Sequence, residues 1–448
     1  MTRFHFIGIG GAGMSVIAEL LDARGHQVQG SDQRESPALE RLRSAGITVY
    51  VGQRAAQVPA DAVVVRSTAV REDNPELAVA RERGQEILHR SEALVLASEG
   101  LDFVAVAGAH GKTTTSAMLA AALVEAGTDP SYAIGGTVLG FGHGARLGSG
   151  SVLVAEADES DGSFLNYTPR IAIVTNVEPD HLDHYGTREN FTAAFLTFAQ
   201  RLTPGGLLIC CADDDGAADL ARSAASTGIR TVTYGRSPHA DAQLDGEHVT
   251  LGGRTTRLSL QVAGEHNRLN AAAAFIAGVE LGVPASLMGR CLGAFRGTRR
   301  RFEPRGSVGA VRLVDDYAHH PTEVEATLAT ARTQVGSGRV LVLFQPHLFS
   351  RTHTFADRFA AALSTADGCV VTDIYPARED PIPGVTSRLI TDQLEGADYV
   401  PDRIEAAHAI AEAATPGDLI ITMGAGDVTE LADVVRERLL ERESRGEL

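Results

Sequence analysis

The chain has 448 residues, of which 44% are hydrophobic, and these values predict roughly three domains with ample cores. Its formal net charge is −17. Because no basic surface dominates, this charge argues against a protein that binds nucleic acid or anionic membranes, while leaving room for a small anionic substrate in a local pocket.

Strand-like apolar runs alternate with helical patterns along almost the whole chain. The runs that we expect to form strands are residues 4–9, 62–65, 103–107, 152–155, 171–176, 207–211, 311–314, 340–344, 369–372 and 419–423. Helical patterns lie between them, for example at 14–24 and 114–126. This alternation predicts α/β units with mostly parallel sheets, and several separate nucleotide-type openings argue against one large sheet.

Domain boundaries are expected near 98–102 and 302–306, which gives domains 1–98, 99–304 and 305–448. Within the second domain, residues 241–262 alternate in polarity and carry turn signals, so we expect a small antiparallel patch there. Residues 431–445 have the pattern of a charged, exposed helix.

The first strand is followed by a glycine-rich turn that fits a dinucleotide-binding fingerprint. Gly8, Gly10 and Gly13 lie between this strand and the next helix, and Asp32 ends the following strand-like segment. Such a turn lets a pyrophosphate approach a helix N-terminus. Asp32 either binds a ribose or simply ends its strand. The fingerprint does not separate NAD from a UDP-type ligand.

Lys112 is the only lysine of the chain, and it lies in a glycine-rich segment after the strand at 103–107. Gly108 and Gly111 allow a sharp turn there, and a helix opens at Thr113. The backbone N–H groups of such a loop point at phosphates, the lysine reaches the β- and γ-phosphates, and the threonine hydroxyl binds Mg²⁺. The spacing is shorter than the usual GxxxxGK[ST], so a ligand-free turn is the alternative.

Acidic and histidine clusters follow the next two strands. Four acids lie within residues 156–161, where a metal bound to phosphate needs carboxylates, although a solvated acidic turn would look the same. His181 and His184 form an HxxH pair after the strand at 171–176. Mg²⁺ is favoured over zinc, because the other expected ligands are hard oxygens.

The later polar motifs have both functional and structural explanations. Asn267 and Asn270 share a helix face, and they either contact a base edge or cap the helix. Residues 299–301 are three arginines, which form a solvated linker or deliver a charge to the γ-phosphate. Residues 315–321 and 345–352 follow strands, and open α/β sheets bind ligands at the carboxyl ends of strands.

The remaining sequence features indicate a soluble protein of the cytoplasm. Cys210, Cys211, Cys291 and Cys369 form no CxxC pair, so we expect buried free thiols in a reducing compartment. The N-terminus shows no signal-peptide pattern, and no apolar run approaches the ~20 residues of a membrane helix. We therefore expect cytoplasmic localisation, no membrane insertion, and a monomer or weak homodimer.

Taken together, eight segments in order closely resemble the Mur ligase family. The segments are residues 8–15, 107–115, 156–164, 175–185, 264–274, 299–303, 315–324 and 345–352, and the resemblance covers essentially the whole chain. It implies a Rossmann-like N-terminal domain, a central P-loop-type ATP-binding α/β domain with a mostly parallel sheet, and a Rossmann-like α/β C-terminal domain. It also implies that the N-terminal glycines hold the UDP part of a substrate rather than NAD.

Within the family, the sequence is most similar to the branch that adds L-alanine to the lactoyl carboxylate of UDP-N-acetylmuramate for peptidoglycan synthesis. The resemblance implies an ATP-dependent reaction through an acyl phosphate, with ADP and phosphate as products. It also implies Mg²⁺, for which Mn²⁺ could substitute. Many other Mur ligases bridge their metals with a carbamylated lysine, which a chain without a second lysine lacks. Leu348 stands where some members of the branch have arginine.

The resemblance implies roles for individual residues. The catalytic set is Lys112, Glu156, His181 and Arg301, and the metal ligands are Thr113, Glu156 and His181. The ATP-binding set is Gly108, Ala109, His110, Gly111, Lys112, Thr113, Thr114, His266, Asn267, Asn270, Arg301 and Asp316. The UDP-substrate set is Gly8, Gly10, Gly11, Ala12, Gly13, Asp32, Ser67, Asp158, Glu159 and Ser160. The amino-acid set is Tyr317, His319 and Arg351.

Three other functions stay open at this point. The nearest is a related ligase that attaches a recycled murein peptide to the same acceptor, and residues 10–15 and 322–324 favour the alanine-adding branch over it. A second is an NAD-dependent oxidoreductase that uses residues 8–13, although no separate hydride-transfer machinery is visible. A third is a nucleotide-binding switch without catalysis.

Overall fold

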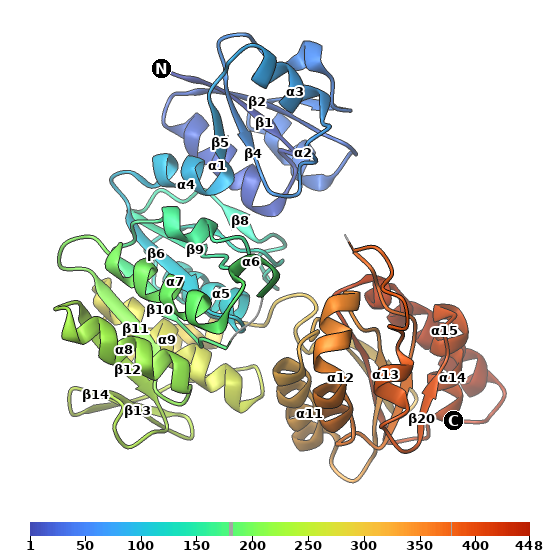
Figure 1. Cartoon of the computed structure of the whole chain (residues 1–448). Helices are drawn as coiled ribbons and strands as arrows, with labels where there is room; N and C mark the ends of the chain where they lie inside the picture. The colour runs from blue at the N-terminus through green and yellow to red at the C-terminus, as the bar shows by residue number, and fades with distance from the viewer. Residues whose placement is uncertain (179–181, 378) are drawn as a thin grey trace. The chain divides into compact units, whose positions relative to one another are not determined.

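In the computed structural model, residues 1–178, 182–377 and 379–448 are described, and they form three separate β-sheets (Figure 1). The sheets fall within residues 3–89, 102–257 and 303–423. The mostly parallel α/β architecture predicted from the alternating pattern is therefore confirmed, as is the absence of a single large sheet in the described residues.

The first sheet has five parallel strands in the order β3-β2-β1-β4-β5. Its strand order reverses beside β1, and such a switch point is where doubly wound sheets bind ligands. The strands are β1 (Arg3–Ile7), β2 (Gln27–Asp32), β3 (Thr48–Val51), β4 (Val63–Arg66) and β5 (Ile87–His89). The helices are α1 (Ala12–Ala23), α2 (Pro37–Ser44), α3 (Pro75–Glu82) and α4 (Arg90–Ser98), with the 3-10 turn η1 (Ala55–Gln57).

The second sheet has ten strands in the order β15-β14-β13-β12-β11-β10-β6-β9-β7-β8. Its strands from β13 to β7 run parallel to one another. The small antiparallel patch predicted at 241–262 is confirmed, because β13, β14 and β15 pair antiparallel. The strands are β6 (Asp102–Ala107), β7 (Ser131–Ala133), β8 (Ala145–Arg146), β9 (Val152–Glu156), β10 (Ile171–Val174), β11 (Leu207–Cys211), β12 (Arg230–Gly235), β13 (Ala242–Asp245), β14 (His248–Leu251) and β15 (Arg254–Arg257).

The helices that accompany this sheet include long, apolar ones that bury the parallel strands. They are α5 (Lys112–Glu125), α6 (Leu182–Tyr185), α7 (Arg188–Gln200), α8 (Asp215–Ser226), α9 (Glu265–Glu280) and α10 (Ala285–Cys291), with the 3-10 turns η2 (Ser163–Asn166) and η3 (Leu292–Ala294). Cys210, Cys211 and Cys291 are buried free thiols here, and Cys369 is another in the third sheet, as expected.

The third sheet has six strands in the order β16-β17-β21-β18-β19-β20, and only its β16–β17 pair is antiparallel. The strands are β16 (Glu303–Val308), β17 (Val311–Asp316), β18 (Val340–Phe344), β19 (Gly368–Val371), β20 (Ala397–Tyr399) and β21 (Leu419–Met423). The helices are α11 (Pro321–Val335), α12 (Phe349–Leu363), α13 (Arg388–Thr391), α14 (Arg403–Ala413) and α15 (Leu431–Ser444), with the 3-10 turn η4 (Asp427–Glu430).

Both faces of the third sheet are covered. In β18, Val342 and Phe344 pack in one apolar cluster while Leu341 and Leu343 pack in another, as the alternating geometry of a strand requires. The helix predicted at 431–445 is confirmed as α15, but it is not exposed all round. Leu431, Val435 and Leu439 are buried because they repeat every four residues along one face.

The chain divides into two compact units. The first comprises residues 1–262 and 267–296 and holds the first two sheets, and the second comprises residues 263–266 and 297–448 and holds the third. Among the described residues, no helix is long and apolar enough to cross a membrane.

Candidate active site

The glycine turn after β1 is held in shape by Asp32. Gly8 adopts a φ of 81°, and the Gly10 N–H donates to Asp32 Oδ2 at 2.9 Å. A Cβ on Gly10 would lie 2.9 Å from the same oxygen and 3.0 Å from Leu39 Cδ2, so a side chain has no room there. Asp32 therefore does more than end its strand, because it fixes the turn that the sequence predicts to receive a pyrophosphate.

The other residues predicted for the UDP substrate surround this turn or lie after β9. Gly11 is the N-cap of α1 and Ala12 begins the helix. Ser67 directly follows β4, which pairs with β1 in parallel, so Ser67 lies at the same edge of the sheet as the turn. Asp158, Glu159 and Ser160 belong to the segment after β9, and the Ser160 N–H donates to Asp158 Oδ1 at 3.1 Å.

Arg90, which the sequence prediction missed, joins these two places within the first unit. It is the first residue of α4, and its Nη2 lies 3.0 Å from Asp158 Oδ2. A Cβ built on Gly13 would lie 3.5 Å from Arg90 Nη1, so the guanidinium borders the glycine turn. The sequence signal was weak, because it consists of one arginine after the short strand β5.

The phosphate loop runs from β6 to α5, and its two glycines are required by geometry. Gly108 has a φ of 129°, and a Cβ there would overlap the Thr175 hydroxyl. Gly111 is the N-cap of α5 with a φ of 82°, and a Cβ there would lie 2.8 Å from Asn270 Oδ1. The backbone of this loop is therefore open at the N-terminus of a long helix, which is the arrangement that binds phosphate.

Asn176 fixes the middle of the loop. The His110 N–H donates to Asn176 Oδ1 at 3.0 Å, and Asn176 Nδ2 donates to the His110 carbonyl at 3.0 Å. The Thr175 hydroxyl donates to the same carbonyl. Both side chains follow β10, so the neighbouring strand shapes the loop, a role that the sequence prediction did not assign to them.

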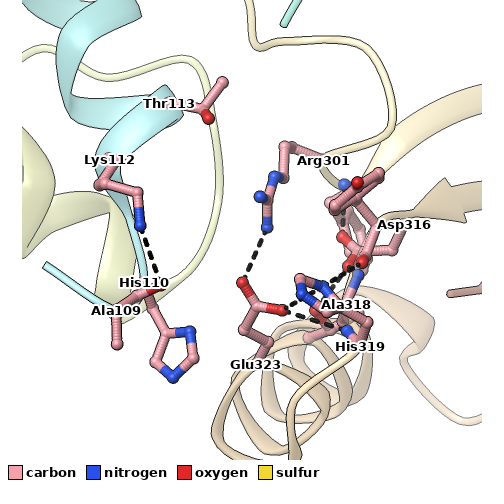
Figure 2. A network of polar contacts seen from close by, with 12 residues as sticks. Ala109, His110, Lys112, Thr113, Arg301, Asp316, Ala318, His319 and Glu323 are labelled. Atoms are coloured by element: carbon pink, nitrogen blue, oxygen red, sulfur yellow. Dashed lines mark hydrogen bonds and ion pairs between the residues drawn. The ribbon is translucent and has the colours of Figure 1, made fainter. Parts of the chain in front are cut away.

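Lys112 begins α5 and points back over the loop (Figure 2). Its Nζ donates to the Gly108 carbonyl at 2.6 Å and lies 2.8 Å from Glu159 Oε2. Burial lowers the pKa of Lys112, but the carboxylates of Glu159 and Asp158 outweigh burial and hold the pKa above its ordinary value. The lysine is therefore a fixed positive charge at the position where the sequence predicts phosphates.

Thr113 and Glu156 lie together at the same end of α5. The Thr113 hydroxyl donates to Glu156 Oε2 at 3.1 Å, and the Gly135 N–H donates to Glu156 Oε1 at 2.7 Å. Burial raises the pKa of Glu156, opposed by the Gly135 hydrogen bond and by Lys112. A partly buried carboxylate beside a hydroxyl is a hard-oxygen pair that suits Mg²⁺, and a bound cation would offset the cost of removing this charge from water.

The remaining residues predicted for ATP and metal have different outcomes. His181 lies outside the described residues. Asn267 and Asn270 are both inside α9, which begins at Glu265, so the prediction that they could be helix caps is wrong. Both are nearly buried, and Asn270 contacts the loop at Gly111 as described above. Ala109 accepts a long hydrogen bond of 3.4 Å from Lys112, and Thr114 lies in the first turn of α5.

In the second unit, Glu323 links Arg301 to His319 in a charged network (Figure 2). Arg301 Nη1 lies 3.2 Å from Glu323 Oε1, and its guanidinium carbon lies 5.1 Å from the centre of the Tyr317 ring. The linker explanation for this arginine is therefore wrong, because its charge is held by a carboxylate and an aromatic ring.

Burial together with the charge of Arg301 lowers the pKa of His266 to about 4, so His266 is neutral.

Asp316 ends β17 and accepts three hydrogen bonds. Its Oδ2 accepts from the Phe302 N–H at 2.7 Å, and its Oδ1 accepts from the Ala318 N–H at 2.8 Å and from the Thr327 hydroxyl at 3.1 Å. Burial raises its pKa to about 6, against the opposing effect of Arg301. Asp316 can therefore change charge near neutral pH.

The three residues predicted for the amino acid gather near one another in the second unit. His319 Nδ1 lies 3.0 Å from Glu323 Oε2, and its ring centre lies 5.2 Å from that of Tyr317. Burial lowers the pKa of His319, opposed by Glu323. Arg351 Nη1 lies 3.4 Å from His347 Nδ1, and the His347 ring lies 5.8 Å from His319. Glu323 and His347 connect these residues, and the sequence prediction assigned no contact to either.

The fold and site define an α/β nucleotide-binding enzyme, in which a phosphate loop with one lysine follows a parallel strand. Three family models match the chain, described as Mur ligase family, catalytic domain (residues 3–99), Mur ligase middle domain (106–278) and Mur ligase, glutamate ligase domain (300–426). The chain belongs to the Mur ligase family. Mur ligases are ATP-dependent enzymes, so the oxidoreductase alternative is wrong.

Individual relatives carry more specific names. The chain is 54% identical to a UDP-N-acetylmuramate–L-alanine ligase of Renibacterium salmoninarum, over 98% of this chain and 96% of that protein. It is also 54% identical to one of Paenarthrobacter aurescens, over 98% and 97%. Among solved structures, a UDP-N-acetylmuramate-alanine ligase of Thermotoga maritima is 28% identical with a TM-score of 0.78, and each chain is covered completely.

Proposed function

We propose that the protein joins L-alanine to the lactoyl carboxylate of UDP-N-acetylmuramate at the expense of ATP, as a cytoplasmic step of peptidoglycan precursor synthesis. The observation that carries this proposal is the 54% identity, along nearly the full length, to ligases of that name. The fold is similar along the whole chain to that of a solved ligase of the same name.

The chemistry requires activation of the carboxylate. An amine does not displace oxide from a carboxylate. Transfer of the γ-phosphoryl group of ATP to the carboxylate releases ADP and forms an acyl phosphate, from which the amine then displaces phosphate to form the amide. The first step brings an anionic carboxylate to an anionic γ-phosphate, and preorganised positive charge lowers that barrier. Lys112, whose ammonium is held over the loop, and the N-terminus of α5 supply such charge. The family resemblance supports Arg301 as a further proposed positive charge.

Mg²⁺, or Mn²⁺ in its place, would shield the phosphate charges when bound. Thr113 and Glu156 are the proposed ligands of one ion, supported by their 3.1 Å contact, and His181 is the proposed ligand of a second. Glu156 keeps its orientation through the Gly135 N–H, which leaves its other oxygen toward Thr113. Asn267, Asn270 and His266 are the proposed adenine contacts, and Asp316 is proposed near the nucleotide.

The other two substrates have separate proposed sites. The glycine turn with Asp32 and Ser67 would hold the UDP part, in a proposed domain of residues 1–98. Tyr317, His319 and Arg351 would hold L-alanine, in a proposed domain of residues 305–448. Residues 99–304 are the proposed ATP-binding domain. The proposed assembly is a monomer or a weak homodimer.

A phosphate-release assay with ATP and UDP-N-acetylmuramate tests the proposal. L-alanine, glycine, L-serine and a murein tripeptide should be compared at equal concentrations, and L-alanine should give the highest kcat/KM. A preference for the tripeptide would indicate a murein peptide ligase instead. A solved structure with that name, from Psychrobacter arcticus, is 26% identical to this chain with a TM-score of 0.69. ATP binding without turnover dependent on an amino acid would indicate a nucleotide-binding switch.

A further inference from the structure

Glu159 lies against the lysine of the phosphate loop. Its carboxylate oxygens are 2.9 Å and 2.8 Å from Lys112 Nζ, and the residue is 1% exposed. An ion pair in so little water is much less screened than one on the surface. Lys112 is therefore held by a strong internal anion before any other anion reaches it.

A nucleotide needs the same ammonium. The lysine of a phosphate loop contacts the β- and γ-phosphates, which are anions like the Glu159 carboxylate. Two anions beside one ammonium repel each other, so phosphate and Glu159 compete for Lys112. Nucleotide binding therefore requires the ion pair between Glu159 and Lys112 to break, and the free energy of that ion pair is subtracted from the binding free energy.

The main chain of Glu159 is anchored, so the competition involves its side chain. The Glu159 carbonyl accepts from the Tyr185 hydroxyl at 2.5 Å and from the Gly162 N–H at 3.1 Å. The preceding residue, Asp158, is held by Arg90 at 3.0 Å. A phosphate that takes over Lys112 thus requires a rotation of the Glu159 side chain, while the segment after β9 keeps its position.

We propose that Glu159 is a displaceable counter-ion of Lys112 that lowers the affinity of the loop for ATP, rather than a contact of the UDP substrate. This inference rests on the proposed function, because it takes the loop to be the ATP site. The counter-ion compensates the charge of the partly buried ammonium between catalytic cycles. Breaking its contact with Lys112 weakens nucleotide binding, which favours release of ADP.

The test compares Glu159→Gln with Asp161→Asn by calorimetric titration of a non-hydrolysable ATP analogue with Mg²⁺. Asp161 is an acid of the same segment that lies 3.8 Å from His89 Nε2, so it serves as the matched control. Glu159→Gln should bind the analogue about tenfold more tightly than wild type, because a unit charge next to the phosphates is removed. Asp161→Asn should bind like wild type.

Tightening is a result that local damage does not produce, because a disturbed loop binds phosphate more weakly. Equal or weaker binding by Glu159→Gln would overturn the inference, and an increased KM for UDP-N-acetylmuramate with unchanged nucleotide affinity would assign Glu159 to the UDP substrate instead. If Glu159→Gln does not fold, Glu159→Asp withdraws the carboxylate by one methylene and should tighten binding less. A wild-type protein that binds no ATP analogue would overturn the proposed ATP site, and the inference with it.

Discussion

Gly111→Ala is expected to disable the phosphate loop, and Gly127→Ala is its matched control. The two glycines flank α5 and have nearly the same backbone conformation, with φ of 82° and 78°. An alanine in this left-handed region costs about 1–2 kcal/mol at either position. A Cβ on Gly127 meets no atom within 4 Å, whereas a Cβ on Gly111 lies 2.8 Å from Asn270 Oδ1.

The difference between the two variants therefore isolates the contact at the loop. Asn270 or the loop must move by about 0.6 Å to restore an ordinary contact of 3.4 Å. Because misplacement by ~1 Å can cost about 100-fold in rate, Gly111→Ala should lose about 10- to 100-fold in kcat/KM for ATP. Gly127→Ala should keep wild-type kcat/KM with a small decrease in Tm, and Gly111→Ala should show a decrease in Tm at least as large.

The assay is phosphate release at saturating UDP-N-acetylmuramate and L-alanine, with ATP varied. Wild-type kcat/KM in Gly111→Ala would refute the reasoning that this glycine makes room for the loop. An equal loss in both variants would refute it too, because the loss would then come from the helix backbone rather than from the contact with Asn270.

Three further predictions concern Lys112, Glu156 and Asp316. Lys112→Arg should lose most ligase activity while the protein remains folded, because a planar guanidinium keeps the charge but not the reach of a compact ammonium beside Gly108 and Glu159. Near wild-type turnover would contradict the phosphate clamp. Glu156→Gln should raise the Mg²⁺ concentration needed for half-maximal activity by tenfold or more, and an unchanged Mg²⁺ titration would remove Glu156 from the metal site. Burial raises the pKa of Asp316 to about 6 in the folded protein, against an ordinary 3.8, so the folded protein holds this proton more tightly than the unfolded chain does. The free energy of unfolding should therefore fall by up to about 3 kcal/mol as pH rises from about 4 to 6. Asp316→Asn should make the decrease of Tm over that range shallower, and an unchanged slope would show that Asp316 does not titrate there.

The sequence predicted the elements whose signal is local. Strands β6, β10, β11, β18 and β21 are continuous apolar runs, and each lies where the sequence predicted it. Strands such as β3, β5 and β20 were not predicted, because they are three or four residues long and are defined by pairing with a neighbour. The exposure of α15 was overestimated for a related reason: its charged residues dominate the composition, while its buried face becomes evident only against the sheet.

The residues of the candidate site likewise include some that the sequence predicted and others that it did not. Lys112, Thr113 and Glu156 could be predicted because they lie at the ends of strongly patterned elements. The side chains that shape the site could not, because their partners are distant in sequence. Asn176 is 66 residues from the His110 that it holds, and Arg90 is 68 residues from Asp158. Glu323 was visible in a motif, but its position between Arg301 and His319 depends on how β17 leads into α11.

The covered, protonated state of Lys112 has a practical consequence for chemical labelling. Reagents that acylate amines need the neutral amine, and Lys112 carries the only side-chain amine of the chain. Among the amines of the chain, such reagents should therefore modify the N-terminal amine in preference to Lys112. Conversely, a nucleotide bearing a reactive acyl phosphate would have a single lysine to modify, and the modified peptide would report occupancy of the phosphate loop without any mapping of competing sites.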